Sequence, residues 1–458
     1  MSKRFEAYGW HVQWVKDGDN DWDGIEAAIK KAQEVKDKPS MIRLTTTIGF
    51  GSKLQGTGGV HGNPLKEDDC KQVKSKFGFD PDQTFVVPQE VYDAYHKHAS
   101  EGAAAEQEWN KLLEKYSGEH KDLGEDLKRR LTKKLPQGWQ EKLPVWKPSD
   151  AATATRKTSE ATLEAIHNAV PELLSGSADL TGSNNTRWKN AVDFQPPSLG
   201  IGDWTGRYLR YGVREHAMAG IMNGLSAYGT VIPAGGTFLN FVSYASGSVR
   251  LSSLSHQRVI YVATHDSIGL GEDGPTHQPI ETLVHFRALP NMMVWRPADG
   301  NETSAAYYMA LTSHSTPSIL ALTRQNLPQL EASTIDKAIK GGYVALEEPS
   351  AKITLVSTGS EVSICLEAAK VLKDQGTPAR VVSMPCVEVF DAQSKEYKLK
   401  CIPDGIPAMS VEVMSTLGWE KYSHEQFGLN RFGASGPYKD VYKVCPCHMS
   451  RLERALRM

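Results

Sequence analysis

The stretch RVIYVATHDSIGLGEDGPTHQP, residues 258–279, joins a short apolar run to a polar loop. Residues 259–263 offer no polar side chain to water, so they predict a β-strand that is buried on both faces. His265 and Asp266 follow directly at the carboxyl end of that strand. Ligands bind at this edge of open α/β sheets, so His265, Asp273 and His277 are candidate functional residues.

Three glycines of this loop, Gly269, Gly271 and Gly274, match the spacing of a dinucleotide-binding fingerprint. Such a fingerprint requires the glycines to open a helix directly. Here Pro275 follows them, and the next helix is expected near Pro279, whose fixed φ suits a first helical turn. The glycines are therefore interpreted as a tight turn rather than as a nucleotide site.

The chain has 458 residues, with 52 basic and 54 acidic side chains and a formal net charge of -2. A chain of this length accommodates about three domains, each with its own core. The balanced charge provides no broad basic surface for nucleic acid or for an anionic membrane, and no apolar run of about 18 residues predicts a membrane span. We therefore expect a globular cytoplasmic protein in which local positive charge accounts for any anionic substrate.

The six cysteines have no regular spacing, which favours a reducing compartment over a disulfide framework. Cys445, Cys447 and His448 form a C-P-C-H cluster that is similar to half of a metal site. No second pair lies nearby to complete a tetrahedral set of ligands, so the cluster is interpreted as a surface accident. The sequence therefore predicts no metal ligands among these residues.

The order of the predicted helices and strands divides the chain into four parts. Residues 1–90 combine a helix, a strand and a glycine-rich loop that carries His61, which is typical of the C-terminal remnant of an α/β domain. Residues 91–148 are charged and predict a solvated helical linker. Residues 149–335 and 336–458 alternate strands with helices, so each predicts a three-layer α/β domain.

Long motifs along nearly the whole chain resemble the transketolase family. They are SADLTGSN at 177–184, YGVREHAM at 211–218, GGTFLNF at 235–241, THDSIGLGEDGPTHQP at 264–279, WRPADGNE at 295–302, LTRQNLPQL at 322–330 and NRFGASG at 430–436. The resemblance implies successive three-layer α/β domains. These are the tail of a diphosphate-binding domain over residues 1–90, the thiamine diphosphate-binding fold of a pyrimidine-binding domain over 149–335, and a transketolase C-terminal domain over 336–458.

The resemblance implies transfer of a two-carbon ketol unit between sugar phosphates in the pentose phosphate pathway, with thiamine diphosphate and Mg²⁺ as cofactors. A carboxyl group beside the pyrimidine ring of the cofactor favours the tautomer that activates the thiazolium carbon, and the motif assigns this role to Glu215. The motifs also imply Phe241 against that ring, with Phe238 and Tyr244 close by, and Asp179 in the cofactor pocket. On their helical spacing alone the aromatic residues would be ordinary core residues, and Glu215 an ordinary helix-start glutamate.

The resemblance also assigns residues to the phosphate group of the substrate. Phosphate recognition favours cations in fork geometry. The matching motifs imply four side chains around the phosphate: Arg156, Ser183, His265 and Arg324. Without its motif, either arginine would be interpreted as an ordinary surface ion-pair residue.

Three further residues are assigned by the resemblance to sugar hydroxyls and to proton transfer. Asp273 accepts a hydrogen bond from a hydroxyl beside the reacting carbon, while His277 and His61 contact hydroxyls and move protons near the cleaved bond. Histidine suits this task because its unperturbed pKa lies near neutrality. Without the motif, His61 in its glycine-rich loop is equally consistent with a structural role.

The chain departs from the family pattern near its N-terminus. The Gly-Asp-Gly motif and the downstream asparagine that hold the metal and the diphosphate are not found, so we expect the chain to lack the N-terminal part of the diphosphate-binding domain, together with the Mg²⁺ ligands. The family resemblance implies a homodimer that binds sugar phosphates and neither nucleic acid nor membrane. Two alternatives stay open: a catalytically silent chain that dimerises or caps a partner, and dihydroxyacetone synthase, with formaldehyde as acceptor.

Overall fold

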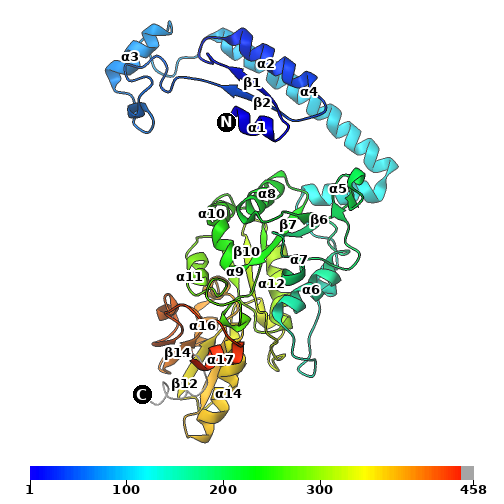
Figure 1. The fold of residues 1–458 in the computed structure, drawn as a ribbon, viewed down its shortest axis with the longest axis vertical. Helices are drawn as coiled ribbons and strands as arrows, with labels where there is room; N and C mark the ends of the chain where they lie inside the picture. Colours follow the sequence, from blue (N-terminus) through cyan, green and yellow to red (C-terminus); the bar gives the residue numbers. More distant parts are fainter. Residues whose placement is uncertain (445–458) are drawn as a thin grey trace. The chain divides into compact units, whose positions relative to one another are not determined.

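The computed structural model describes residues 1–444, and Figure 1 shows their fold. The chain separates into two compact units, Met1–Leu112 and Leu113–Met458. Cys70, Cys365, Cys386 and Cys401 are free thiols, whereas the cysteine–histidine cluster at 445–448 lies outside the described residues. No helix within residues 1–444 has the length and apolar character to cross a membrane.

The first unit contains a parallel pair of strands covered by a helix. The strands are β1 (His11–Val15) and β2 (Ser40–Leu44), and α2 (Trp22–Glu34) packs against both. Asp21 caps α2, because its side chain accepts a hydrogen bond from the N–H of Gly24 at 2.9 Å. The remaining elements of this region are α1 (Ser2–Ala7), η1 (Gly58–Val60), α3 (Glu67–Lys76) and α4 (Gln89–Glu119).

The second unit contains a central domain built on a parallel sheet. Its strand order is β5-β4-β6-β3-β7-β8-β10-β9. The strands are β3 (Leu173–Ser177), β4 (Asp193–Phe194), β5 (Gly202–Asp203), β6 (Tyr208–Arg210), β7 (Ile232–Phe238), β8 (Ile260–Thr264), β9 (Met293–Trp295) and β10 (Ser318–Leu322). Two helical segments, α5 (Lys121–Leu131) and η2 (Trp139–Lys142), precede this domain.

Helices cover both faces of this sheet, as Figure 1 shows. One face packs against α6 (Thr155–Ile166) and α12 (Gly300–Thr312), and the other against α8 (Glu215–Tyr228), α10 (Ser246–Leu254) and α11 (Thr282–Arg287). Strand β8 contributes to both cores in alternation, since Ile260 and Val262 point to the first and Tyr261 and Ala263 to the second. The expected strand that is buried on both faces is therefore present.

The C-terminal domain contains a second sheet with the strand order β11-β13-β12-β14-β15. Only β11 (Tyr343–Leu346) pairs antiparallel among the strands of residues 1–444, with β13 (Ala379–Ser383) as its neighbour. The other strands are β12 (Ile353–Ser357), β14 (Ala408–Val411) and β15 (Glu425–Phe427). Apolar residues of α14 (Glu361–Asp374) pack on one face, and α15 (Val387–Asp391) with α16 (Lys395–Cys401) on the other. The three-layer α/β fold class is confirmed in both domains.

The aromatic residues spaced as on a helix do not share one helix. Phe238 ends β7, Phe241 lies in α9 (Leu239–Val242), and Tyr244 lies in η4 (Ser243–Ala245). The sequence interpretation missed this strand because it contains two glycines. A Cβ on Gly235 would lie 2.6 Å from the sulfur of Met222 in α8, so glycine leaves room for this methionine side chain against the strand.

Candidate functional site

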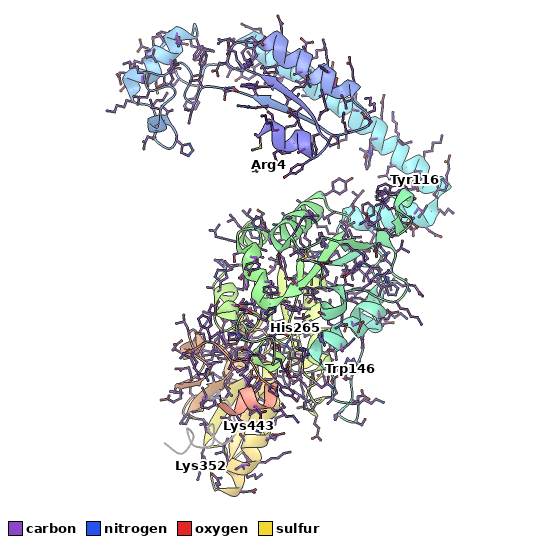
Figure 2. All side chains as sticks on the ribbon, viewed as in Figure 1. Arg4, Tyr116, Trp146, His265, Lys352 and Lys443 are labelled. Atoms are coloured by element: carbon purple, nitrogen blue, oxygen red, sulfur yellow. The ribbon has the colours of Figure 1, made fainter. Side chains whose placement is uncertain are left out.

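The carboxyl ends of four neighbouring strands collect most of the candidate residues at one edge of the central sheet. Strands β3, β7, β8 and β10 run parallel, and β7 lies between β3 and β8. Asp179 follows β3, Phe238 ends β7, His265 follows β8 and Arg324 follows β10. Figure 2 labels His265 within this domain. The topology therefore brings these residues to the position at which α/β proteins bind ligands.

Aromatic rings form a continuous row at this edge. The ring of Phe238 stacks on His265 with centroids 3.8 Å apart and on Phe241 at 5.6 Å, and Phe241 stacks on Tyr244 at 5.5 Å. His277 meets Phe241 edge to face at 5.1 Å. The row runs from the buried ring of His265 to the exposed ring of Tyr244. Phe241 and Tyr244 therefore present partly open aromatic surface to a planar ligand.

His265 is buried in an unusual backbone conformation. Its φ is 60°, which lies in the left-handed region, and only 3% of the residue is exposed. Burial, followed by the charges of Arg156, Arg324 and His277, lowers the pKa of His265 to about 3. The imidazole is therefore neutral at neutral pH.

Hydrogen bonds define which ring nitrogen of His265 carries the proton. The hydroxyl of Thr264 donates to Oδ1 of Asn184 at 2.6 Å, and it lies 2.8 Å from Nδ1 of His265. A hydroxyl has one proton to donate, so Thr264 accepts from Nδ1–H of the neutral ring. Nε2 of His265 then carries a lone pair.

Two arginines lie beside this ring. After burial, the charge of Arg324 is the main cause that lowers the pKa of Arg156. Nη1 of Arg156 donates to the carbonyl of Ser183 at 2.8 Å, and Nη1 of Arg324 donates to the carbonyl of Leu270 at 3.3 Å. Neither arginine forms an ion pair with a carboxylate of the described residues. The pair leaves N–H donors and positive charge available to an anion.

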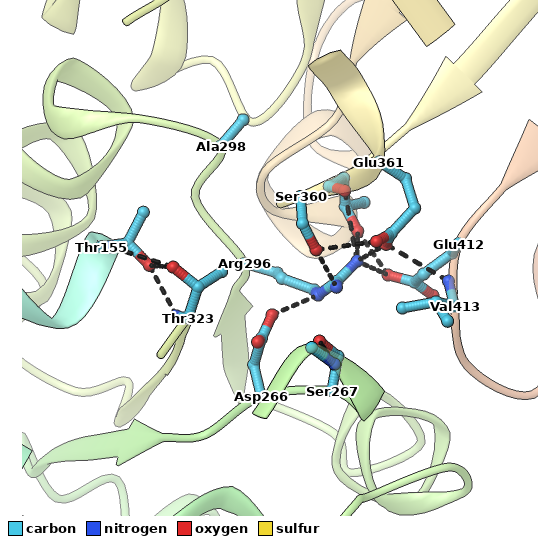
Figure 3. Close-up of polar contacts among 12 residues, drawn as sticks. Thr155, Asp266, Ser267, Arg296, Ala298, Thr323, Ser360, Glu361, Glu412 and Val413 are labelled. Carbon is cyan, nitrogen blue, oxygen red and sulfur yellow. Dashed lines mark hydrogen bonds and ion pairs between the residues drawn. The ribbon is translucent and has the colours of Figure 1, made fainter. Parts of the chain in front are cut away.

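A buried pair of threonines, Thr155 and Thr323, lies next to the two arginines in the sequence, and Figure 3 shows the hydrogen bonds of this pair. Thr155 and Thr323 directly precede Arg156 and Arg324. The backbone N–H of Thr155 donates to Oγ1 of Thr323 at 3.0 Å, and the N–H of Thr323 donates to Oγ1 of Thr155 at 2.7 Å. These reciprocal hydrogen bonds keep the backbones of Arg156 and Arg324 close together, although the two side chains carry like charges.

The remaining candidates have less defined surroundings. Glu215 begins α8, is half-buried, and has no hydrogen bond or ion pair with another residue of 1–444. Asp179 has a φ of 62° and is exposed, and Asp273 is exposed between the left-handed Gly271 and Gly274. As expected, these glycines form turns and do not open a helix, since α11 begins at Thr282.

His61 belongs to the first unit, where it is exposed at the end of η1, so its assignment stays a prediction. The roles of the other candidates also stay predictions, although their positions at one sheet edge are observed. No group of three or more His, Cys, Asp or Glu residues within 1–444 could hold a metal ion.

The sequence interpretation missed a buried charge cluster next to His265. Arg296 pairs with Asp266 and Glu361, and all three side chains are almost wholly enclosed. Two of these residues belong to the family motifs: Arg296 is part of WRPADGNE, and Asp266 follows His265 in THDSIGLGEDGPTHQP. An arginine directly after the apolar strand β9 is the signal that could have revealed the cluster.

Sequence models of three domains match the chain in order. The transketolase thiamine diphosphate binding domain matches residues 1–136, the pyrimidine binding domain 151–329 and the transketolase-like C-terminal domain 341–446. A chloroplastic transketolase of Craterostigma plantagineum is 45% identical over 452 residues, which cover 97% of this chain and 86% of that protein. The chain belongs to the transketolase family.

Fungal members of the family are more similar in sequence. A probable transketolase of Schizosaccharomyces pombe is 61% identical over 444 residues, and this chain spans 65% of its length. A crystal structure of transketolase from Pichia stipitis in complex with sedoheptulose-7-phosphate has a TM-score of 0.96 at 58% identity, and the match covers 99% of this chain and 67% of that one. The family assignment from the sequence motifs is confirmed.

One expectation about the transketolase domains was wrong. The sequence was expected to contain only a remnant of the diphosphate-binding domain, over residues 1–90, that lacks the N-terminal part of the domain. The match instead extends over residues 1–136, so the expected loss is not borne out. The expectation rested on the absence of one short motif. The four domain boundaries stay predictions.

The lowered pKa of His265 predicts a pH dependence of stability. Between about pH 6.5 and 3 the unfolded chain binds a proton that the folded chain does not, so the stabilising contribution is present above pH 6.5 and is lost as the pH falls. The unfolding free energy of the wild type should decrease relative to His265→Gln by about 1–2 kcal/mol from pH 6.5 to 5. Urea unfolding of both proteins measures this difference, and equal pH slopes would contradict the assignment.

Proposed function

We propose that this protein is a thiamine diphosphate-dependent transketolase that moves a two-carbon ketol unit from a ketose phosphate to an aldose phosphate in the cytoplasmic pentose phosphate pathway. The observation that carries the proposal is the unpaired cations Arg156 and Arg324 beside the neutral ring of His265, at the edge where the aromatic row ends. The sugar phosphate bound to the transketolase of Pichia stipitis supports the same substrate class. Cell fractionation that recovers the protein outside the cytosol would contradict the location.

Arg156 and Arg324 bind the phosphate group in this proposal. Nε of Arg156 is buried without a hydrogen-bond partner among the described residues, so this group is available to a phosphate oxygen. Ser183 offers its hydroxyl, because its carbonyl is already occupied by Arg156. Burial is the first cause of the lowered pKa of His265, and a phosphate dianion between the two arginines would act against the second cause, which is their positive charge. His265 would then take up a proton at Nε2 and donate it in a hydrogen bond to the phosphate.

Asp273, His277 and His61 contact the sugar in the same proposal. Asp273 accepts a hydrogen bond from a hydroxyl beside the reacting carbon, and it is exposed on the loop between two glycine turns. His277 belongs to the same loop, and its ring lies against Phe241 of the aromatic row. This position suits a group that moves protons near the cleaved bond. His61 is proposed to contact sugar hydroxyls and to move protons near the cleaved bond on the strength of its motif.

The function is tested by ketol transfer with matched donors. Each of Arg156→Gln and Arg324→Gln should lower kcat/KM by about 10- to 100-fold for a ketose phosphate, because each removes a charged hydrogen bond, and should nearly spare the unphosphorylated ketose. The surface variant Lys352→Gln is the control. Activity should require thiamine diphosphate and be lost with EDTA.

Three results would count against this assignment. Equal losses for both donors would mean that the arginines are structural. Preferred transfer to formaldehyde would favour dihydroxyacetone synthase, and no transfer in the presence of both cofactors would favour a silent chain.

Glu215 and the aromatic row fit the pyrimidine side of the cofactor. Glu215 is a half-buried carboxylate without a partner in residues 1–444, and Phe241 and Tyr244 are stacked with part of their surface open. Bound thiamine diphosphate supplies the nucleophilic carbon of the reaction. Glu215 would hydrogen-bond the pyrimidine ring and so favour the tautomer in which the cofactor is reactive, and Phe241 would contact the ring face. Phe238, Tyr244 and Asp179 complete the pocket and orient the ring.

Mg²⁺ accompanies the diphosphate in this proposal, because the ion binds phosphate oxygens together with a few protein oxygens. The described residues contain no acidic or histidine cluster suited to a metal ion. No residue of the chain is therefore assigned to the ion. Loss of ketol transfer on addition of EDTA tests whether the reaction requires Mg²⁺.

Replacement of Glu215 tests the cofactor assignment separately from substrate turnover. Glu215→Gln preserves the shape of the side chain and removes the carboxylate, so hydrogen–deuterium exchange at the thiazolium carbon of the bound cofactor should slow by about 10²- to 10⁴-fold. The dissociation constant of the cofactor should change much less. Glu281→Gln, on the exposed start of α11, is the matched control. Unchanged exchange in Glu215→Gln would remove the assignment.

We also propose that the protein is a homodimer formed through α8 and α10. These two helices pack together and expose apolar side chains, among them Ile221 at 47%, Tyr228 at 84% and Leu254 at 61%. Exposed apolar patches of this kind mark protein interfaces. A twofold interface uses the same patch on both copies, so a self-complementary apolar surface suits it.

A charge within this patch should disrupt the dimer. Ile221→Asp and Leu254→Asp should shift the protein to monomers, because each buries an unpaired carboxylate in the apolar interface. Sedimentation velocity at several concentrations measures the change. Leu417→Asp is the control, since Leu417 is 64% exposed in the C-terminal domain. A monomeric wild type, or dimers that persist in both α8 and α10 variants, would contradict the proposal.

A further inference from the structure

The guanidinium of Arg296 lies wholly buried between the central domain and the C-terminal domain, as Figure 3 shows. Its Nε donates to Oδ2 of Asp266 at 2.9 Å. On the opposite side, Nη1 donates to Oγ1 of Thr358 at 3.0 Å and pairs with Glu361, and Nη2 donates to Oγ of Ser360 at 3.1 Å. One side chain therefore joins the loop after β8 to the loop that opens α14.

The C-terminal domain also holds the main chain of Arg296. The N–H of Arg296 donates to the carbonyl of Pro385 at 2.8 Å, and its carbonyl accepts from the N–H of Gly359 at 3.0 Å. Gly359 has a φ of 52°, and a Cβ there would lie 2.9 Å from the side chain of Arg296. The loop before α14 is thus shaped around this arginine.

Charges around Arg296 favour its ionised form. Burial alone would lower the pKa of Arg296, but Glu361, Asp266 and Glu412 raise it well above its usual value. Arg287 compensates Glu412 with two bonds of 2.8 and 2.9 Å. Removal of the Arg296 cation would leave Asp266 and Glu361 as buried carboxylates without a charged partner.

Asp266 connects this cluster to the proposed substrate site. It is the residue after His265, whose φ of 60° is sparsely populated by residues other than glycine. Such a conformation persists only where its surroundings hold it. The backbone N–H of Asp266 donates to the carbonyl of Leu322 at 3.2 Å, and its carboxylate is held by Arg296. His265 is therefore followed by a residue that is anchored at both its backbone and its side chain.

We propose that Arg296 is a positioning residue for the reaction: through Asp266 it holds His265 beside Arg156 and Arg324, and the C-terminal domain fixes Arg296 in place. The C-terminal domain thereby contributes to substrate binding without a contact to the substrate. This role rests on the proposed function, because it assumes that Arg156, Arg324 and His265 bind the sugar phosphate.

The chain provides a matched control for a purely structural role. Arg287 joins the same two domains, is 12% exposed and makes two bonds to Glu412, but it forms no contact with Asp266. If the cluster only holds the domains together, loss of Arg287 and loss of Arg296 should affect substrate binding alike. If Arg296 positions the loop, only its loss should do so.

The variants Arg296→Met, Arg296→Lys, Asp266→Asn and Arg287→Met test the proposal in the complete protein. Amide hydrogen exchange of residues 264–270 should accelerate at least tenfold in Arg296→Met and in the milder, isosteric Asp266→Asn. Arg296→Lys should restore part of the protection because it retains the charge. Arg287→Met should exchange like the wild type over the same residues. This readout needs no catalysis, so an absence of ketol transfer would count against the proposed function alone.

Steady-state kinetics provide the second readout. KM for a ketose phosphate should rise at least tenfold in Arg296→Met and Asp266→Asn, while the dissociation constant of the cofactor stays within twofold and Arg287→Met keeps the wild-type KM. Unchanged exchange at 264–270 in both variants, or equal effects of the Arg287 and Arg296 substitutions on exchange and KM, would overturn the proposal.

Discussion

Arg296 is enclosed by protein on every side, so its charge must be compensated where it lies. Asp266 provides one carboxylate from the central domain, and Glu361 and Glu412 provide two from the C-terminal domain. A buried cation of this kind tolerates only arrangements that bring these carboxylates to it, because an unpaired buried charge is strongly destabilising. The pairs of Arg296 with Glu361 and Glu412 therefore constrain the relation of the two domains. The pair with Asp266, within the central domain, constrains the backbone next to His265.

The arginines at the carboxyl edge of the central sheet, Arg156 and Arg324, differ from Arg296, because neither pairs with a carboxylate of residues 1–444. Burial, followed by the charge of Arg324, lowers the pKa of Arg156, and burial, followed by the charges of Arg156, Arg324 and His277, lowers the pKa of His265 and keeps it neutral. Threonines that precede the arginines fix them by reciprocal buried hydrogen bonds. Groups with perturbed pKa values and unpaired donors cluster at functional sites, and an anion is the ligand that relieves this arrangement. The buried, fully paired charge of Arg296 thus holds the loop after β8, and the unpaired charges of Arg156 and Arg324 lie beside that loop.

Local sequence patterns predicted the parts of the fold that depend on local rules. The apolar run at 259–263 is buried on both faces, and Ser360 stands at the N-cap position of α14, which serine favours. The side chain of Ser360 does not cap the helix, because it binds Arg296 and Glu361 instead. Motif resemblance identified the family and the residues that gather at the sheet edge.

Other features depend on partners that are distant in sequence. Arg296 meets Asp266 across 30 residues and Glu361 across 65, so an isolated arginine in the sequence carries no sign of its burial. Strand β7 ends at Phe238 and α9 begins at Leu239, a change that the helical spacing of the aromatic residues does not reveal. Absence of one short motif near the N-terminus suggested a shortened domain over residues 1–90, whereas the match to the diphosphate binding domain extends over residues 1–136.

The most direct test of the account is a crystal structure of this protein with a ketose phosphate. The account predicts that the phosphate oxygens lie within hydrogen-bond distance of Arg156 and Arg324, that Nε2 of His265 faces the same group, and that the Asp266–Arg296 pair is unchanged. A sugar phosphate bound elsewhere, or bound at this edge with its phosphate away from both arginines, would contradict it.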